Sequence, residues 1–156
     1  MNAKSIRIIC VGNRYVESDN VGPRVYDYLA RRDMPEDVSL IDGGLAGLDL
    51  LRFVEGGRRV VFVDALHGFV PGDLPLVLDH GTALGEWAAG YGHDGGLAYL
   101  LRMLPAVCGN GLPEIALVGA GAPVATDVVG HLAEMALSIA TGEWHERGHN
   151  PAISAA

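Results

Sequence analysis

Two aspartates and one histidine stand where polar side chains at the ends of strands and helices could meet. Asp64 closes an apolar run over residues 60–63, and Asp19 comes just before a helical pattern. His93 lies in a glycine-rich segment that precedes another helical pattern. Two carboxylates and an imidazole form a donor set that suits a borderline divalent ion such as Ni²⁺, Zn²⁺ or Mn²⁺. We therefore expect a single metal site built from these three residues.

Each of the three residues also has an ordinary structural explanation. Asp19 could cap a helix, because a carboxylate is favoured at a helix N-terminus. Asp64 could mark the point at which a strand reaches solvent, and a lone loop histidine such as His93 is often only solvated. Their shared position at the mouths of elements favours the metal site, because open α/β sheets bind ligands there.

Apolar runs and helical patterns alternate along the whole chain. Short β-rich runs predict strands over residues 6–11, 38–41, 60–63, 76–78 and 115–118. Apolar side chains at helical spacing predict helices over residues 21–29, 48–54, 97–104 and 128–139, the last one capped by Thr126 or Asp127. Such alternation predicts a mostly parallel sheet with helices on both faces.

The ligand crevice of such a sheet lies beyond the carboxyl ends of its strands. Three of the predicted strands run there into loops of glycine, asparagine and aspartate, at residues 12–13, 42–44 and 64–65. Asp42 therefore joins Asp64 as an acid at this edge.

Length and composition indicate one globular domain. Hydrophobic residues make up 49% of the 156 residues and charged residues 19%, which excludes a disordered chain. We expect a single α/β domain over residues 1–142 and a flexible polar tail over residues 143–156.

The charge and the cysteine count limit the partners and the compartment. With 19 acidic residues, 11 Lys and Arg and a net charge of −8, the chain is a poor match for nucleic acid. Its apolar stretches are too short to span a bilayer, so no membrane partner is expected. Two cysteines are too few for a disulfide scaffold, which favours a reduced, cytoplasmic protein.

The sequence gives less support to other catalytic motifs than to the metal site. His145 and His149 match the H-E-x-x-H pattern of zinc proteases, but Gly148 interrupts the motif and Asn150-Pro151 ends any helix directly after it. No His, Cys, Asp or Glu follows that could supply a third ligand. The first glycine loop lacks the G-x-G-x-x-G of a dinucleotide site, and no G-x-S-x-G elbow is present.

Taken together, the motifs resemble those of the hydrogenase maturation endopeptidases. Gly12-Asn13, Asp19 and Gly22 are similar to that family's G-N-x(4)-D-[DE]-x-x-G opening, and residues 42–51 resemble its D-G-G-T-x-G box with a leucine-rich helix. Val63-Asp64-Ala65, Pro71-Gly72, and His93 followed by Gly96-Leu97 then come in the family's order. The resemblance runs from about Ile6 to Leu137.

The resemblance implies a fold, a reaction and a partner. The fold is a three-layer α/β/α sandwich with a twisted, mostly parallel sheet of about five strands. The reaction removes the C-terminal extension of a [NiFe] hydrogenase large-subunit precursor after nickel insertion, by an enzyme expected to be a monomer. Asp19, Asp64 and His93 would bind the nickel, which the precursor supplies.

Two mechanisms and one alternative function stay open. The metal could polarise the scissile carbonyl or activate water, or it could only dock the precursor while Asp42 assists hydrolysis. A nickel-binding chaperone or checkpoint protein for hydrogenase assembly that never cuts is the alternative function.

The chain departs from the family pattern near the site. Cys10 stands where the family has glycine, Ser18 replaces the first acid of the D-[DE] pair, and Leu45 replaces threonine in the D-G-G box. The three expected ligand positions are retained, so we expect metal recognition to be retained as well.

Overall fold

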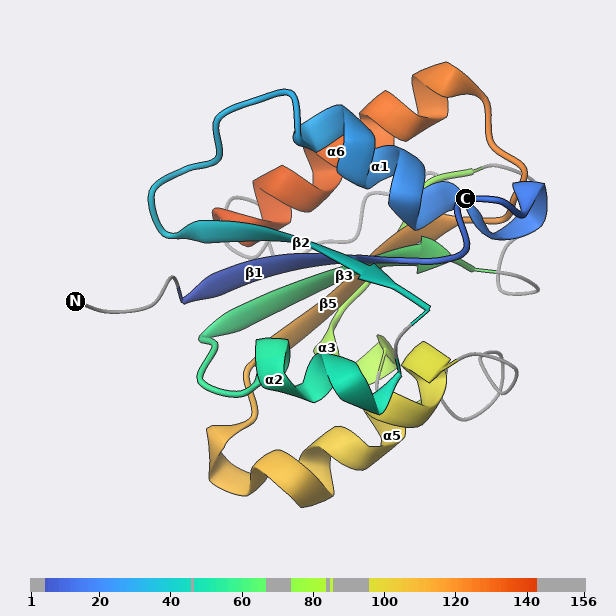
Figure 1. Cartoon of the computed structure of the whole chain (residues 1–156). Helices are drawn as coiled ribbons and strands as arrows, with labels where there is room; N and C mark the ends of the chain where they lie inside the picture. The colour runs from blue at the N-terminus through green and yellow to red at the C-terminus, as the bar shows by residue number, and fades with distance from the viewer. Residues whose placement is uncertain (1–4, 46, 67–73, 84, 86–95, 143–156) are drawn as a thin grey trace.

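The computed structural model describes residues 5–45, 47–66, 74–83, 85 and 96–142. Five strands form one sheet, in the order β2-β1-β3-β5-β4 (Figure 1). They are β1 (Ile6–Val11), β2 (Val38–Gly44), β3 (Arg59–Ala65), β4 (Leu76–Leu78) and β5 (Glu114–Ala120). The first, second, third and fifth strands are parallel, and β4 pairs antiparallel with β5. The mostly parallel sheet is therefore confirmed.

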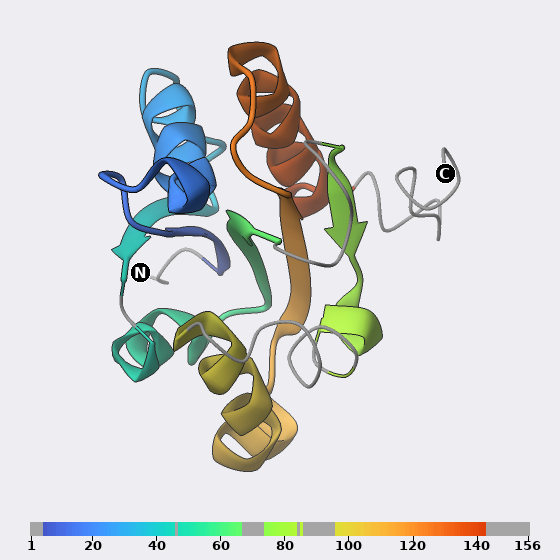
Figure 2. The same ribbon diagram turned by 90° about the vertical axis from the view of Figure 1, so that its right-hand side faces the viewer.

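Helices cover both faces of this sheet. Helices α1 (Val21–Leu29) and α6 (Thr126–Ala140) lie on one face. The other face carries η2 (Leu48–Leu50), α2 (Leu51–Val54), α3 (His80–Thr82), α5 (Gly96–Cys108) and η4 (Gly109–Gly111). Figure 2 shows the sheet between the two helical layers, as the three-layer sandwich requires. No helix within the described ranges is long and apolar enough to cross a membrane.

The central strands are apolar over most of their length because both of their faces are buried. In β1, Ile8 and Cys10 pack toward α1 and α6, whereas Ile9 and Val11 pack toward α2 and α5. Phe62 of β3 is fully buried in the second of these cores. The sheet is thus packed between two hydrophobic cores, one on each face.

The predicted cap of the last helix is wrong. Helix α6 begins at Thr126, its N-cap is Ala125, and no side chain caps it. Asp127 lies inside the first turn, where its carboxylate interacts favourably with the helix dipole. Helix-capping propensity favours a polar residue such as Thr126 or Asp127 as the N-cap. The helix begins one residue earlier than that, so the apolar Ala125 is the N-cap.

Strand β2 extends to Gly44 and so runs past its predicted end. It pairs with β1 through a register shift, so that Cys10 pairs with Asp42 and Val11 with Gly44. Ladder hydrogen bonds use backbone atoms only, so the polar and glycine residues remain in the sheet. Asp42 is thereby fixed beside β1.

We expect His80→Ala to destabilise the protein by about 1–3 kcal/mol, because the variant leaves a buried amide without an acceptor. The Nδ1 atom of His80 accepts a hydrogen bond of 3.0 Å from the Ile115 amide. The Ile115 amide lies in β5, two residues before Leu117, and the pairing of β5 with β4 ends at Leu117. Urea unfolding measures the change, with exposed His131→Ala as the control. Equal midpoints for the two variants would show that the imidazole is dispensable.

Candidate functional site

The expected acids lie at the carboxyl edge of the sheet. Asp64 is the penultimate residue of β3, and Asp19 ends η1 (Glu17–Asp19), in the connection from β1 to α1. The short helix η1 contacts β3 directly. The structure thus brings together two of the three predicted metal ligands.

The Asp64 carboxyl sits in an environment that disfavours its charged form. Its side chain is partly buried, and burial raises its pKa well above the ordinary value. A 2.8 Å hydrogen bond from the Ala65 amide to Oδ1 opposes this shift, and the nearby Asp19 carboxylate adds to it. The contact of η1 with β3 brings Asp19 near enough for its charge to act on Asp64.

Asp19 is held by the first glycine loop and does not cap α1. Its Oδ2 atom accepts a 3.1 Å hydrogen bond from the Asn13 amide. The N-cap of α1 is Asn20, which makes no side-chain capping bond. The Oδ1 atom of Asn20 is buried and has no hydrogen-bond partner among the described residues, which leaves an unsatisfied acceptor beside Asp19.

Two glycines fix the backbones that carry the two acids. Gly12 has a φ of 144°, and a Cβ atom there would lie 2.3 Å from the carbonyl oxygen of Asp19. A Cβ atom at Gly119 in β5 would lie 2.0 Å from the carbonyl oxygen of Asp64. The backbone carbonyl of each acid therefore packs directly on a glycine, and any larger residue at that position would displace it.

Asp42 lies at the same carboxyl edge of the sheet, and its carboxylate contacts Gly44 and Arg14. Its Oδ1 atom accepts a 3.2 Å hydrogen bond from the Gly44 amide, and its Oδ2 atom lies 3.7 Å from Arg14. Arg14 also bonds both oxygens of Asp27 on α1, at 2.8 and 3.3 Å. Because β1 lies between β2 and β3, Asp42 is two strands away from Asp64.

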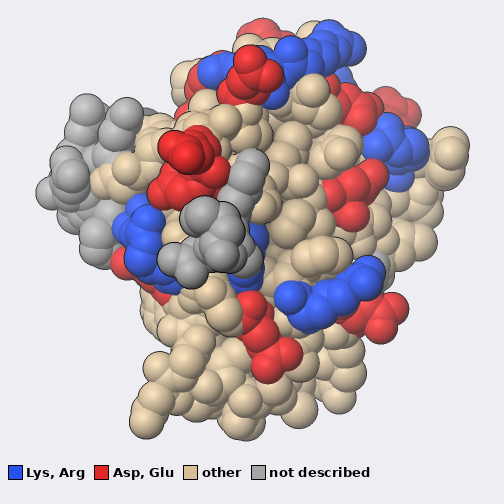
Figure 3. All heavy atoms as spheres, turned by 60° about the vertical axis from the view of Figure 1, so that its left-hand side comes forward, with Lys and Arg blue, Asp and Glu red and all other residues tan. Residues whose placement is uncertain are grey.

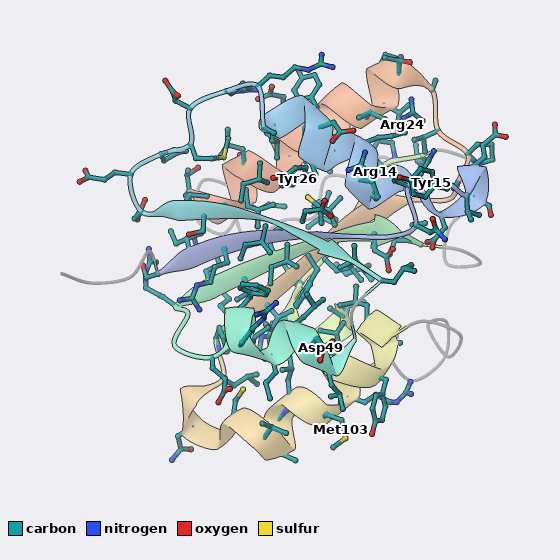
Figure 4. All side chains as sticks on the ribbon, in the orientation of Figure 1. Arg14, Tyr15, Arg24, Tyr26, Asp49 and Met103 are labelled. Carbon is teal, nitrogen blue, oxygen red and sulfur yellow. The ribbon has the colours of Figure 1, made fainter. Side chains whose placement is uncertain are left out.

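A cavity of about 330 Å³ opens beside Asp42 and Arg14. The loops after β1 and β2 line it, with Tyr15 and Leu45 at its wall. Figure 4 shows Arg14 and Tyr15 together, next to the start of α1. The cavity gives the carboxyl edge a concave surface that could accept part of a ligand.

The third predicted ligand, His93, lies outside the described residues, as do His145 and His149 of the H-E-x-x-H motif. Gly96, the first described residue after His93, packs backbone to backbone on Gly47: a Cβ atom on Gly96 would lie 3.1 Å from the Gly47 Cα atom. Within the described ranges no three His, Cys, Asp or Glu side chains group around a possible metal position. The metal site therefore stays a prediction.

The Cys10 thiol is not a candidate nucleophile. It is fully buried, and its pKa is raised by burial first and by the charges of Asp42 and Asp27 second. A thiol that stays protonated in an apolar core is inert. The departure from glycine at this position is therefore accommodated in the core.

A mostly parallel α/β sandwich with an acidic pair at the carboxyl edge of its sheet is typical of domains that bind a ligand at this edge. Within that class, the profile of the HycI hydrogenase maturation proteases matches residues 23–138, and the chain belongs to this family.

Curated relatives match over part of their length. The hydrogenase expression/formation protein HupD of Bradyrhizobium diazoefficiens is 34% identical over 76 residues, which cover 47% of this chain and 40% of that protein. HoxM of Azotobacter vinelandii is 33% identical over 81 residues, covering 51% of this chain and 39% of that protein. The matched part thus spans about two fifths of either relative.

Solved structures share the fold over almost the whole chain. The hydrogenase maturating endopeptidase HybD from E. coli has a TM-score of 0.71 at 23% identity, covering 92% of this chain and 93% of that one. The [NiFe] hydrogenase maturation protease HycI from Thermococcus kodakarensis KOD1 has a TM-score of 0.68 at 21% identity, covering 89% and 94%. These likenesses confirm the predicted three-layer architecture.

Proposed function

We propose that this chain is an endopeptidase that removes the C-terminal extension of a [NiFe] hydrogenase large-subunit precursor after nickel insertion. The interacting pair Asp19 and Asp64, at the carboxyl edge of the sheet in a member of the maturation protease family, carries the proposal. Such an edge is where this fold class binds its ligands.

The proposed nickel contacts are Asp19, Asp64 and His93. Two carboxylate oxygens and one imidazole nitrogen suit Ni²⁺, and three protein ligands leave positions for groups of the precursor. In this proposal the nickel arrives with the substrate. By binding the ion, the protease distinguishes a precursor that contains nickel from one that does not. The buried Oδ1 atom of Asn20, next to Asp19, has no hydrogen-bond partner in the part of the chain that the structure describes, which supports a binding role for this loop.

The hydrolytic step needs a water molecule, a group that takes its proton and a group that returns one. The water oxygen attacks the scissile carbonyl carbon, the C–N bond breaks, and the released amine gains a proton. Burial raises the pKa of Asp64 in the chain without metal, so in a step in which it does not hold the ion Asp64 can exchange a proton closer to neutral pH than an ordinary carboxyl. If the nickel serves only for docking, Asp42 is the second candidate for accepting the proton from water.

The direct test incubates the purified chain with purified nickel-loaded precursor and with nickel-free precursor. We expect a mass loss equal to the C-terminal extension, and only from the loaded form. Cleavage of both forms would refute nickel recognition. Tight binding of loaded precursor without any mass loss would favour the non-cleaving chaperone.

We expect a chain that lacks residues 143–156 to cleave the precursor within about twofold of the full-length rate, as for a surface change. Gly148 interrupts the H-E-x-x-H motif in this segment, and Asn150-Pro151 follows directly after it. Cleavage rate and circular dichroism of the truncated chain measure the effect. A folded truncation without activity would revive the zinc-protease interpretation.

A further inference from the structure

One stretch of this acidic chain is almost free of charge. Residues 95–113 carry a single charged side chain, Arg102, in a protein with 30 Asp, Glu, Lys and Arg residues among 156. Most of this stretch forms α5, whose inward leucines are buried. A helix that is apolar on its outer face as well needs a partner to cover that face.

The outer face of α5 exposes large apolar side chains. Tyr99 is 46% exposed and Val107 is 45% exposed. Met103 lies between them at a spacing of four residues, so the three side chains share one face of the helix. Figure 4 shows Met103 pointing away from the sheet.

The start of α5 lies against the loop that lines the cavity: a Cβ atom on Gly96 would lie 3.6 Å from the carbonyl oxygen of Leu45. Leu48, 47% exposed, belongs to η2, which contacts α5. Leu45, 68% exposed, and Tyr15, 90% exposed, line the cavity at the carboxyl edge. We call this surface the apolar band; its members are Tyr15, Leu45, Leu48, Tyr99, Met103 and Val107.

The far end of the band is also uncharged. Residues 103–113, which include the end of α5 and η4, contain no charged residue, and the face drawn in Figure 3 has no acidic or basic side chain at its lower end. An exposed apolar surface depleted of charge is typical of the centre of a protein–protein interface.

We propose that the apolar band is the docking surface for the folded part of the large-subunit precursor, and this inference rests on the proposed function. The band begins at the candidate site, so its partner is the molecule that enters the site. The 13 residues of α5 span about 20 Å. An extension peptide that occupies the cavity would leave Val107 uncovered, whereas a folded, apolar partner surface covers the whole band.

The test places a charge at the far end of the band. In Val107→Lys the new cation lies in the last turn of α5, where the helix dipole favours it, so the fold is retained. Leu74→Lys is the matched control, because Leu74 is 44% exposed and lies outside the band. Steady-state cleavage of nickel-loaded precursor gives KM and kcat, and isothermal titration calorimetry gives the Kd of the precursor.

For Val107→Lys we expect KM and Kd to rise at least about tenfold, the effect of an interface anchor, with kcat nearly unchanged. Leu74→Lys should match the wild type.

Different outcomes separate this inference from the proposed function. If the wild type cleaves and Val107→Lys keeps its KM, the docking surface is refuted and the protease stands. If the wild type binds through Val107 without cutting, the docking surface stands and proteolysis fails. A wild-type dimer that Val107→Lys dissociates would assign the band to a second copy and overturn the inference. A wild type that neither binds nor cuts the precursor overturns both.

Discussion

The Asp64→Asn variant is expected to lose precursor cleavage by about 10²–10⁴-fold, the usual effect of removing a positioned proton-transfer group. The same substitution should stabilise the fold at neutral pH, by about 0.5–2 kcal/mol, as relief of a strained functional site often does. The carboxylate is disfavoured by burial and by Asp19, whereas a neutral amide avoids both penalties. The asparagine oxygen can still accept the Ala65 hydrogen bond.

The pH dependence follows from the direction of the pKa shift. Because the pKa of Asp64 is higher in the folded than in the unfolded chain, the folded state binds the proton more tightly. The stability that this proton confers is fully present below the unfolded pKa and is lost as the pH rises through the folded pKa. The advantage of Asp64→Asn should therefore be small near pH 4 and grow toward neutral pH.

Chemical denaturation at several pH values, together with the cleavage assay, measures both effects. Asp37→Asn is the control, since Asp37 is exposed and makes only a 3.8 Å ion pair with Arg58. It should neither raise stability nor slow cleavage. An Asp64→Asn protein that cuts normally would remove Asp64 from the site, and one that is less stable at pH 7 would contradict the electrostatic account.

The elements that were predictable from the sequence are those with strong local patterns. The bounds of β1, β4 and α1 agree with the apolar runs and helical spacing that predicted them. The position of Asp64 at a strand end was predictable because an apolar run stops there. Local patterns suffice for β1 and β3 because burial on both faces of a parallel strand leaves a continuous apolar run, and for α1 because its buried side chains recur at helical spacing.

Long-range contacts at the site could not be predicted. The fit of Gly119 against the Asp64 carbonyl depends on the pairing of β3 with β5, which no local pattern reveals. Arg14 meets Asp27 and Asp42 only because the sheet and α1 bring three separate segments together. Asp19 had two local interpretations, and they are distinguished by its hydrogen bond from the Asn13 amide, the N-cap of α1 at Asn20 and the contact of η1 with β3.

His93→Ala is expected to abolish precursor processing while the free energy of unfolding stays within about 0.5 kcal/mol of the wild type. The proposed site has three protein ligands, so loss of the imidazole removes one of them. The neighbouring sequence, Gly90-Tyr91-Gly92-His93-Asp94-Gly95-Gly96, offers little apolar surface for the core and few substitute donors. Ligand loss and stability loss are therefore separable here, unlike at Asp64, whose neighbour Val63 is fully buried.

Two measurements make this prediction specific to nickel. Cleavage of the loaded precursor is read as the mass loss of the extension, with exposed His131→Ala as the matched histidine control. Calorimetry then compares the affinities for loaded and nickel-free precursor. The wild type should prefer the loaded form, whereas His93→Ala should bind both forms equally, because the contact that senses the ion is gone. A variant that still cuts, or still prefers the loaded form, would place nickel recognition elsewhere and leave Asp19 and Asp64 as an acidic pair without a metal ligand at His93.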